Sequence, residues 1–274
     1  MKRLLFLISI SFCLTIQSQN IYNVVAEDGS KKPTLFATPT TEEEYNYMSK
    51  GYGNALAQGA DLKKGYSVND KIEPTYSGKY NFKFIPFYRS DKSFVGIIVK
   101  AHSDNSNKDY WYCLPLKNEA LFQNFCTSVS ELDELMLNSF VNAYFSFTRE
   151  NVVPNTSDIE YAYMSIGYKN HIADGSDFKK GYKIGETNKR EFVIKGSLAN
   201  YSFSFLPFMR DNGTCAGTIM KLVSDGSMSG GTYYYGVANT NGPLLDSFLK
   251  EKSSYGPRVL KAILQAYVKY TLDN

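Results

Sequence analysis

Two short segments share a pattern of charged residues that could bind an anion. The pattern Gly-x-Asp-x-Lys-Lys-Gly-Tyr occupies residues 59–66 and occurs again at residues 175–182. In a functional interpretation the paired lysines hold an anionic group and the aspartate orients one of them. Turn chemistry explains the same residues, because the first glycine can end a helix, the aspartate can form an Asx-turn and the lysines can be solvated. We favour the structural interpretation and keep as candidate binding residues Asp61, Lys64, Asp177 and Lys180.

Three consecutive aromatic residues occur twice and could supply a stacking surface. The triplets are Tyr-Trp-Tyr at 110–112 and Tyr-Tyr-Tyr at 233–235. Successive side chains of a strand point to opposite faces, so each triplet places at least one ring on each face of a sheet. A wet face would suit stacking on a sugar or a partner protein, whereas a face covered by helices would make the triplet plain core, which we favour. The candidate binding residues are Trp111, Tyr112, Tyr234 and Tyr235.

Two arginines could bind a carboxylate. Arg89 and Arg210 each follow a strand rich in aromatic residues. A guanidinium can hold a carboxylate through two parallel hydrogen bonds, so these residues could recognise an acidic ligand. Arginines at strand ends are more often solvated surface charges, and that alternative stays open. Both residues are kept as candidate binding residues.

The sequence offers little support for catalysis. Its histidines are His102 and His171. The corresponding positions in the other half of the chain hold Val223 and Ala55, so neither histidine belongs to a site common to both halves. No Gly-x-Ser-x-Gly, His-Glu-x-x-His or EF-hand spacing occurs. We therefore predict no catalytic residue, no metal site and no cofactor, although one half could have specialised.

The cysteines allow one disulfide. Cys113 and Cys126 lie close enough in sequence to pair in an oxidising compartment, and Cys215 would then keep its thiol. The alternative is that all three are buried thiols that act as small apolar residues. The sequence leaves both possibilities open.

The two halves of the chain predict an internal duplication. Residues 41–66 and 157–182 are identical at more than half of their positions, and the match continues through the strands and the aromatic triplets. Self-similarity of this extent indicates two repeats of one unit. The predicted segments are a signal peptide at 1–18, an N-terminal extension at 19–40, and α+β repeats at 41–150 and 151–274.

Each repeat is predicted to contain an N-terminal helix, an antiparallel meander of three to four strands and a C-terminal helix. Thr41 with Glu44, and Ser157 with Glu160, are capping boxes that begin the first helices. The side chains expected on the buried face of these helices are Tyr45, Met48, Tyr52 and Leu56, with Tyr161, Met164, Tyr168 and Ile172. Those expected on the C-terminal helices are Leu132, Leu135, Met136, Ala143 and Phe147, with Val259, Leu260, Ile263, Ala266 and Tyr270 after Pro257.

Glycines and prolines refine this prediction. Gly51 and Gly167 lie inside the first helices and predict close packing of the helix backbone. Pro86 and Pro207 lie inside strands and predict an edge position or a bulge. Residues 94–99 are continuously apolar and predict a central strand, which a hairpin at 102–108 connects to the next strand.

The N-terminus and the charge constrain where the protein acts. Lys2 and Arg3 precede an apolar run at 4–16, and Ser18 offers a cleavage point, which is typical of a secretory signal peptide. The run is shorter than the roughly 20 residues of a membrane span. The net charge is +3, and cleavage removes two positive charges, which excludes a strong electrostatic attraction to nucleic acid or to an anionic membrane.

These observations favour an exported, periplasmic or extracellular binding protein without catalysis. Two related modules can clasp one partner or gain avidity for a repetitive ligand, as an inhibitor or immunity-type protein of an envelope enzyme or toxin would. The expected partner is a protein or a glycan. The alternatives are an envelope hydrolase that acts on glycan or peptide, and a structural surface component.

Overall fold

The structure is a computed structural model of the chain, and it describes residues 38–71, 74–149, 152, 154–185, 191–195, 199–226, 230–240 and 242–273. The expected signal peptide and most of the N-terminal extension lie outside these residues. The described chain is α+β, as predicted, and divides into two compact units. We call residues 38–147 with 271–273 the N-terminal unit, and residues 148–270 the C-terminal unit.

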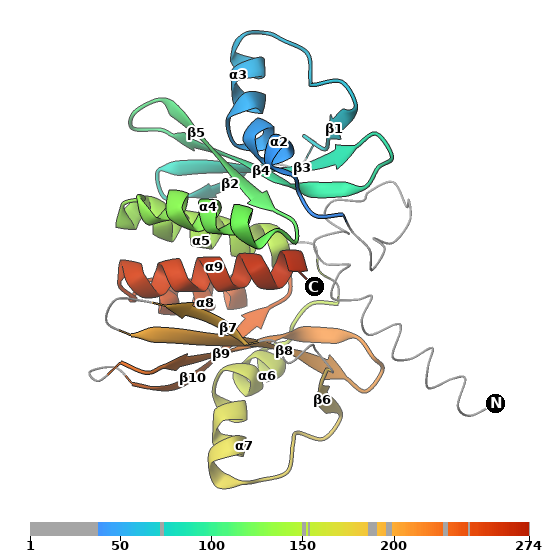
Figure 1. The fold of residues 1–274 in the computed structure, drawn as a ribbon. Coiled ribbons are helices and arrows are strands. Elements are labelled where there is room, and N and C mark those ends of the chain that lie inside the picture. Colours follow the sequence, from blue (N-terminus) through green and yellow to red (C-terminus); the bar gives the residue numbers. More distant parts are fainter. Residues whose placement is uncertain are drawn as a thin grey trace, which may run out of the picture. The chain divides into compact units, whose positions relative to one another are not determined.

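The N-terminal unit starts with a helix that contains a π-helical turn and then forms a sheet and two further helices (Figure 1). Its first helix comprises α2 (Glu42–Asn46), the π-helical turn η1 (Tyr47–Gly51) and α3 (Tyr52–Ala57). Its strands are β1 (Tyr66–Val68), β2 (Thr75–Ser77), β3 (Tyr80–Arg89), β4 (Phe94–Ser103) and β5 (Lys108–Pro115). It ends with α4 (Glu119–Ser130) and α5 (Glu134–Arg149), whose last two residues belong to the C-terminal unit.

The sheet of the N-terminal unit is antiparallel and has the order β1-β3-β4-β5, with β2 also paired to β3. The prediction of three to four strands missed the short strands β1 and β2, which pair with different ends of the same edge of β3. Pro86 faces the gap between them, where its carbonyl accepts a hydrogen bond from the amide of Asn69 at 3.0 Å. Its missing N–H therefore costs no ladder bond. The register shifts one residue later, between Phe87 and Tyr88, which confirms the predicted irregularity.

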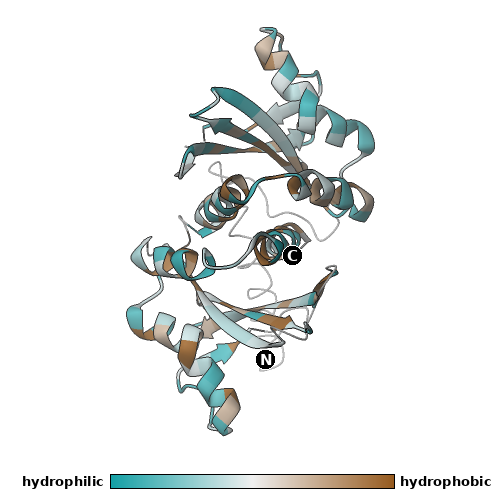
Figure 2. Cartoon of the chain, turned by 90° about the vertical axis from the view of Figure 1, so that its left-hand side faces the viewer, coloured by the Kyte–Doolittle hydropathy of each residue, from teal (hydrophilic) through white to brown (hydrophobic). Residues whose placement is uncertain are grey.

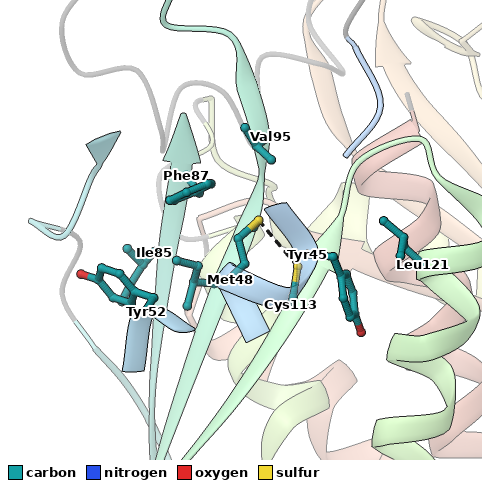
Figure 3. Packing of buried hydrophobic residues seen from close by; sticks show 9 residues of the cluster. Tyr45, Met48, Tyr52, Ile85, Phe87, Val95, Cys113 and Leu121 are labelled. Carbon is teal, nitrogen blue, oxygen red and sulfur yellow. Dashed lines mark hydrogen bonds between the residues drawn. The ribbon is translucent and has the colours of Figure 1, made fainter. Parts of the chain in front are cut away.

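Helices cover both faces of this sheet. On one face Phe82 and Phe84 pack against α5, where their rings lie 5.2 Å and 5.6 Å from those of Phe140 and Tyr144. On the other face the fully buried Met48 of η1 lies in a cluster with side chains of β3, β4 and β5 (Figure 3). The core therefore has two layers, one on each side of the strands.

The C-terminal unit has the same order of elements (Figure 1). Its first helix comprises α6 (Asp158–Ala162), the π-helical turn η2 (Tyr163–Gly167) and α7 (Tyr168–Asp174). Its strands are β6 (Tyr182–Ile184), β7 (Phe192–Lys195), β8 (Asn200–Arg210), β9 (Cys215–Ser224) and β10 (Gly231–Ala238). The helices α8 (Gly242–Lys252) and α9 (Pro257–Asp273) follow, and the strand order is β10-β9-β8-β6, with β7 also paired to β8.

The packing of the C-terminal unit follows the same plan. Met164 of η2 is fully buried against Phe208 and Ile219 on one face of its sheet. On the other face Phe205 lies 5.5 Å from the ring of Tyr267 and 4.5 Å from that of Tyr270. The helices α6 to α7 and α9 therefore cover opposite faces of the sheet.

The local sequence signals set the ends of the first helices. Both capping boxes form as predicted, with Thr41 and Ser157 at the N-caps. Gly59 and Gly175 adopt φ values of +65° and +66° where the helices stop, a region that side-chain-bearing residues rarely enter. Gly51 contacts the ring of Tyr47 on the preceding turn, so the close approach predicted for this glycine occurs within its own helix.

Three helix predictions were wrong. The single C-terminal helix expected in each repeat is a pair, because α4 and α8 precede the longer helices α5 and α9. Leu56 and Ile172, expected on the buried face, are 53% and 47% exposed, because the ends of the first helices extend past the edge of the sheet that these helices cover. Leu135 is 49% exposed, because it lies on the side of α5 that also carries the half-buried Asn142 and Ser146. No helix in the described ranges combines the length and the apolar character that a membrane crossing requires.

Candidate functional site

The repeated lysine motif of the N-terminal unit folds onto its own helix. The backbone amide of Lys63 donates a hydrogen bond to the hydroxyl of Tyr47 at 2.9 Å. Its ammonium group lies 5.7 Å from the ring centres of both Tyr47 and Tyr66 and pairs with Glu43. Asp61 and Lys64, the two candidates predicted here, are exposed, and neither contributes to this arrangement. The motif therefore forms a turn, and Lys63 attaches this turn to the first helix.

The motif of the C-terminal unit has the same geometry. The amide of Lys179 donates to the hydroxyl of Tyr163 at 3.3 Å, and its ammonium lies 5.2 Å and 5.6 Å from the rings of Tyr163 and Tyr182. Asp177 and Lys180 are exposed, like their counterparts. The glycine between lysine and tyrosine has a φ of +87°, as the turn interpretation requires. The structural interpretation of the motif accounts for both units.

Arg89 and Arg210 do bind carboxylates, but these belong to the protein. Nε and Nη2 of Arg89 donate to the two carboxylate oxygens of Glu44 at 2.7 Å and 2.8 Å. Arg210 holds Glu160 in the same way, at 2.6 Å and 2.8 Å. The same glutamates complete the capping boxes, so each closes a bridge between the first helix and the end of the third strand. The guanidinium groups considered as binding sites for a ligand carboxylate are thus engaged by carboxylates of the protein itself.

The electrostatics of these pairs agree with a structural role. Burial acts to raise the pKa of Glu160, but hydrogen bonds from Arg210 and Ser157 outweigh it and lower the pKa to about 2. Burial also acts to raise the pKa of Glu44, but hydrogen bonds from Arg89 and Thr41 outweigh it, so this pKa is lowered as well. Both carboxylates are thus held in the ionised form that the arginines require.

The aromatic triplets contribute mainly to the core. Tyr112 and Tyr235 are only 9% and 5% exposed, so they are core residues and no stacking surface. Trp111 is half-buried, with its ring 5.7 Å from that of Tyr52, and a side-chain carbon at Gly53 would come within 2.5 Å of its indole. Tyr234, its counterpart in the C-terminal unit, lies 5.4 Å from the ring of Tyr168.

The exposed members of the triplets are the first tyrosines. Tyr110 is 38% exposed and Tyr233 is 39% exposed. The sequence analysis did not select them, because alternation along a strand indicates that two faces exist but not which face is covered. Two positions after Tyr110, α5 covers Tyr112, whose ring lies 5.6 Å from that of Phe140.

The disulfide that Cys113 and Cys126 could form is absent from the structure, in which both side chains are thiols. The Sγ of Cys113 lies 3.7 Å from the Sδ of Met48 inside the core (Figure 3). Burial is the main cause that raises the pKa of the Cys113 thiol and that of the buried Cys215. Both thiols therefore remain protonated and pack as small apolar groups.

A cluster of charged side chains that the sequence analysis missed lies on β4 and β5. His102 and Asp109 are directly paired across these strands, and Nδ1 of the imidazole lies 2.8 Å from Oδ1 of the carboxylate. The other carboxylate oxygen accepts a bond from the ammonium of Lys100 at 2.9 Å. That ammonium also lies 5.7 Å from the ring centre of Trp111. The side chains of Lys100, His102 and Asp109 are 34%, 34% and 38% exposed, so the cluster is open to solvent.

The C-terminal unit does not share this cluster. In its sheet Val223 pairs with Thr232, at the positions that His102 and Asp109 occupy in the N-terminal unit. The sequence analysis set His102 aside because its counterpart is a valine. The predicted hairpin at 102–108 placed His102 in the loop, whereas the strands continue to the Ser103–Lys108 pair and so bring His102 opposite Asp109.

The second histidine has no catalytic arrangement. Nδ1 of His171 lies 3.4 Å from the hydroxyl of Ser176, at the exposed end of α7. The nearby Asp174 accepts a bond from the backbone of Ser176 at 2.9 Å. In a triad the carboxylate must instead orient the other nitrogen of the imidazole. Within the described ranges no group of three or more His, Cys, Asp or Glu side chains could hold a metal ion.

The outer surfaces of the two first helices differ in character. In the C-terminal unit Ile159 and Ile166 are 70% and 65% exposed, and the exposed Ala162 lies between them. The corresponding positions of the N-terminal unit hold the exposed charged residues Glu43 and Lys50. Figure 2 shows hydrophobic residues recurring along the helix that begins at α6. We call Ile159, Ala162 and Ile166 the isoleucine stripe.

Comparison with protein-family models, with curated proteins and with solved structures finds no match.

Proposed function

We propose that the chain is an exported, non-catalytic binding protein of two tandem, duplicated modules, whose partner is another protein. The observation that carries the proposal is the isoleucine stripe. Ile159 and Ile166 expose most of their surface on one side of a helix, where the other unit carries charged residues. Contiguous apolar surface on a folded domain marks interaction sites, since its burial against a partner is favourable.

The stripe has the form of a helix-mediated contact. Ile159 and Ala162 belong to α6 and Ile166 to the π-helical turn η2 that continues it, and all three are exposed, so they can contact one groove or one partner helix. The fold itself does not need these side chains to be apolar. Glu43, Asn46 and Lys50 occupy the corresponding positions of the N-terminal unit, which forms the same helix. An apolar stripe at positions that tolerate charge therefore has a use outside the fold.

The common order of elements supports the proposal of two duplicated modules. The pairs that build each unit recur at corresponding residues, for example Arg89 with Glu44 and Arg210 with Glu160. Differences between the units include the outer side of the first helix and the open part of the sheet. Modules that keep their internal contacts and change their surfaces suit a protein that presents different sites on one scaffold, as an inhibitor or immunity-type protein does.

A capture experiment with matched variants tests this function. Purified protein is immobilised and exposed to envelope extract and secretome, and the retained proteins are quantified by mass spectrometry. We expect one stoichiometric partner, and we expect the double variant Ile159→Glu/Ile166→Lys to lose it. The variant carries the residues of the other unit at these positions, so its folding should be unaffected, which circular dichroism and thermal unfolding verify.

The control is Ile172→Lys, which introduces a charge at another exposed isoleucine of the same first helix. It should retain the partner, because Ile172 lies outside the stripe and its counterpart Leu56 is exposed as well. Retention of the partner by the double variant, or the absence of any retained protein with the wild type, would refute the proposal.

A further inference from the structure

The open part of the N-terminal sheet carries a second and separate surface. The side chains there form two rows across β3, β4 and β5, because directly paired residues of an antiparallel sheet point to the same face. One row is Lys83, Lys100 and Trp111, and the next is Asn81, His102 and Asp109. We call these six residues the polar patch. The same face is apolar further along the strands, where it is covered by η1.

The charges of the polar patch are unbalanced. Lys83 and Lys100 lie directly opposite one another, an arrangement of like charges that destabilises a sheet. Asp109 is shared between Lys100 and His102, at 2.9 Å and 2.8 Å. Within the described ranges no carboxylate forms an ion pair with Lys83. The patch therefore presents positive charge that an acidic ligand would compensate.

Asp109 also fixes the orientation of its neighbour. It engages Nδ1 of His102, so Nε2 is on the side of the ring away from the carboxylate. A histidine held in this way offers one defined hydrogen-bonding atom to a ligand. Asn81, directly paired with His102, adds an amide that can donate and accept. This second row therefore supplies hydrogen bonds in fixed directions beside the two lysines.

We infer that the polar patch binds an acidic saccharide. A carboxylate or sulfate group would be held by Lys83 and Lys100, and sugar hydroxyls would bond to Asn81, His102 and Asp109. Trp111, half-buried at the end of the lysine row, provides aromatic surface for the apolar side of the sugar ring. The two rows are about 7 Å apart and the three strands span about 10 Å, which suits one or two sugar units.

Comparison with the C-terminal unit indicates that the fold does not require these residues. Its sheet has the same order and register, yet the positions of the polar patch are filled differently. They hold Ser202, Ser204, Lys221, Val223, Thr232 and Tyr234. The opposed lysines and the His102–Asp109 pair are therefore a specialisation of the N-terminal unit. This inference is independent of the isoleucine stripe, and variants at one surface leave the other intact.

The single tryptophan of the chain gives a direct readout of binding. Because Trp111 lies in the polar patch, its fluorescence can be followed while the purified protein is titrated with hexagalacturonate, with a heparin hexasaccharide and with neutral maltohexaose. We expect a saturable change with at least one of the two acidic saccharides and none with the neutral one. The uronate and the sulfated saccharide distinguish which acidic group is recognised. Isothermal calorimetry gives the affinity independently.

The three variants within the patch are taken from the other unit, so each new residue is known to suit its position in this fold. Lys83→Ser and His102→Val should each weaken binding about tenfold, the loss expected for one charge-assisted hydrogen bond. Asp109→Thr makes the patch more positive but releases His102, and we expect it to weaken binding as well. Lys64→Ser removes a positive charge from the same unit outside the patch and should leave the affinity unchanged.

Several results would overturn the inference. They are the absence of binding to both acidic saccharides, equal binding of maltohexaose, and a loss with Lys64→Ser as large as with Lys83→Ser. Stronger binding by Asp109→Thr would also overturn it, since it would show unspecific attraction between charges in place of a built site. Equal responses to inorganic phosphate or to a glutamate-rich peptide would assign the patch to a ligand of another class.

Discussion

At the scale of single residues, Gly53 and Trp111 show how the size of one side chain limits the size of its neighbour. Gly53 lies against the indole of Trp111, with room for no side-chain carbon. The corresponding residues of the C-terminal unit are Lys169 and Tyr234, where a smaller ring leaves room for a long side chain. The glycine of the N-terminal unit is thus explained by the tryptophan opposite it.

We predict that Gly53→Ala destabilises the protein by about 1–3 kcal/mol, because the added methyl group displaces the indole. The same substitution should be nearly neutral in a Trp111→Tyr background, which provides the smaller ring. Urea unfolding of the four proteins in this double-mutant cycle measures the coupling. Additive effects of the two substitutions would contradict the explanation.

Lys252 is a second residue whose surroundings decide its chemistry. It is fully buried, and burial lowers the pKa of its amine to about 7. The unfolded chain binds this proton up to its usual pKa of about 10.4, so the unfolded state holds one more proton than the folded state between these values. The free energy of unfolding should therefore rise with pH from about 7 to about 10.4 through this residue.

Lys252→Met should remove that pH dependence and stabilise the protein most at or below pH 7, where the wild type buries a charge. Chemical unfolding of both proteins at pH 6, 8 and 10 measures the difference. A constant difference across these pH values would show that the amine does not titrate in this range.

At the scale of elements, each first helix is fastened to its sheet by one ion pair. Glu160 caps α6 and binds Arg210 at the end of β8, and its carboxylate is only 4% exposed. A local capping signal and a long-range contact thus share one side chain. The π-helical turn that follows places Met164 over the sheet.

We predict that Glu160→Gln lowers the free energy of unfolding by about 2–3 kcal/mol at neutral pH, since it leaves Arg210 without a negative partner. The pKa of Glu160 is lowered to about 2, so its contribution is fully present above the ordinary value and is lost as the pH falls from about 4.5 to 2. The difference between wild type and variant should therefore shrink over this range. Asp158→Asn, in the same first turn, serves as a control for a change of charge at the helix start.

At the scale of the whole molecule, the proposed function requires export. We predict that the mature protein begins at Gln19, after cleavage behind Ser18, and mass spectrometry of the N-terminal peptide from the exported fraction checks this. A charge in the apolar run, as in Leu7→Arg, should retain the precursor inside the cell, because the run would no longer be recognised as a signal peptide. A mature protein that keeps residues 1–18 would contradict the prediction.

The two units also divide the binding surfaces between them. The isoleucine stripe lies on the C-terminal unit and the polar patch on the N-terminal unit, and each lacks a counterpart in the other. The sequence analysis looked for sites common to both halves, as Asp61 with Asp177 and Arg89 with Arg210 illustrate. The structure assigns those shared residues to turns and internal ion pairs or leaves them as exposed charges. The distinctive surfaces are found where the halves differ.

The sequence by itself determined the features that depend on neighbouring residues. The helix starts at Thr41 and Ser157, the turns at Gly59 and Gly175 and the hairpin after β4 follow from interactions within a few residues, so local patterns predict them. The tertiary structure decided the rest. Glu44 forms an ion pair with Arg89, and His102 lies within hydrogen-bond distance of Asp109. Tyr110 is exposed, whereas Tyr112 is buried. These outcomes depend on strand register and on how far each helix extends over a sheet, which only contacts between distant parts of the chain establish.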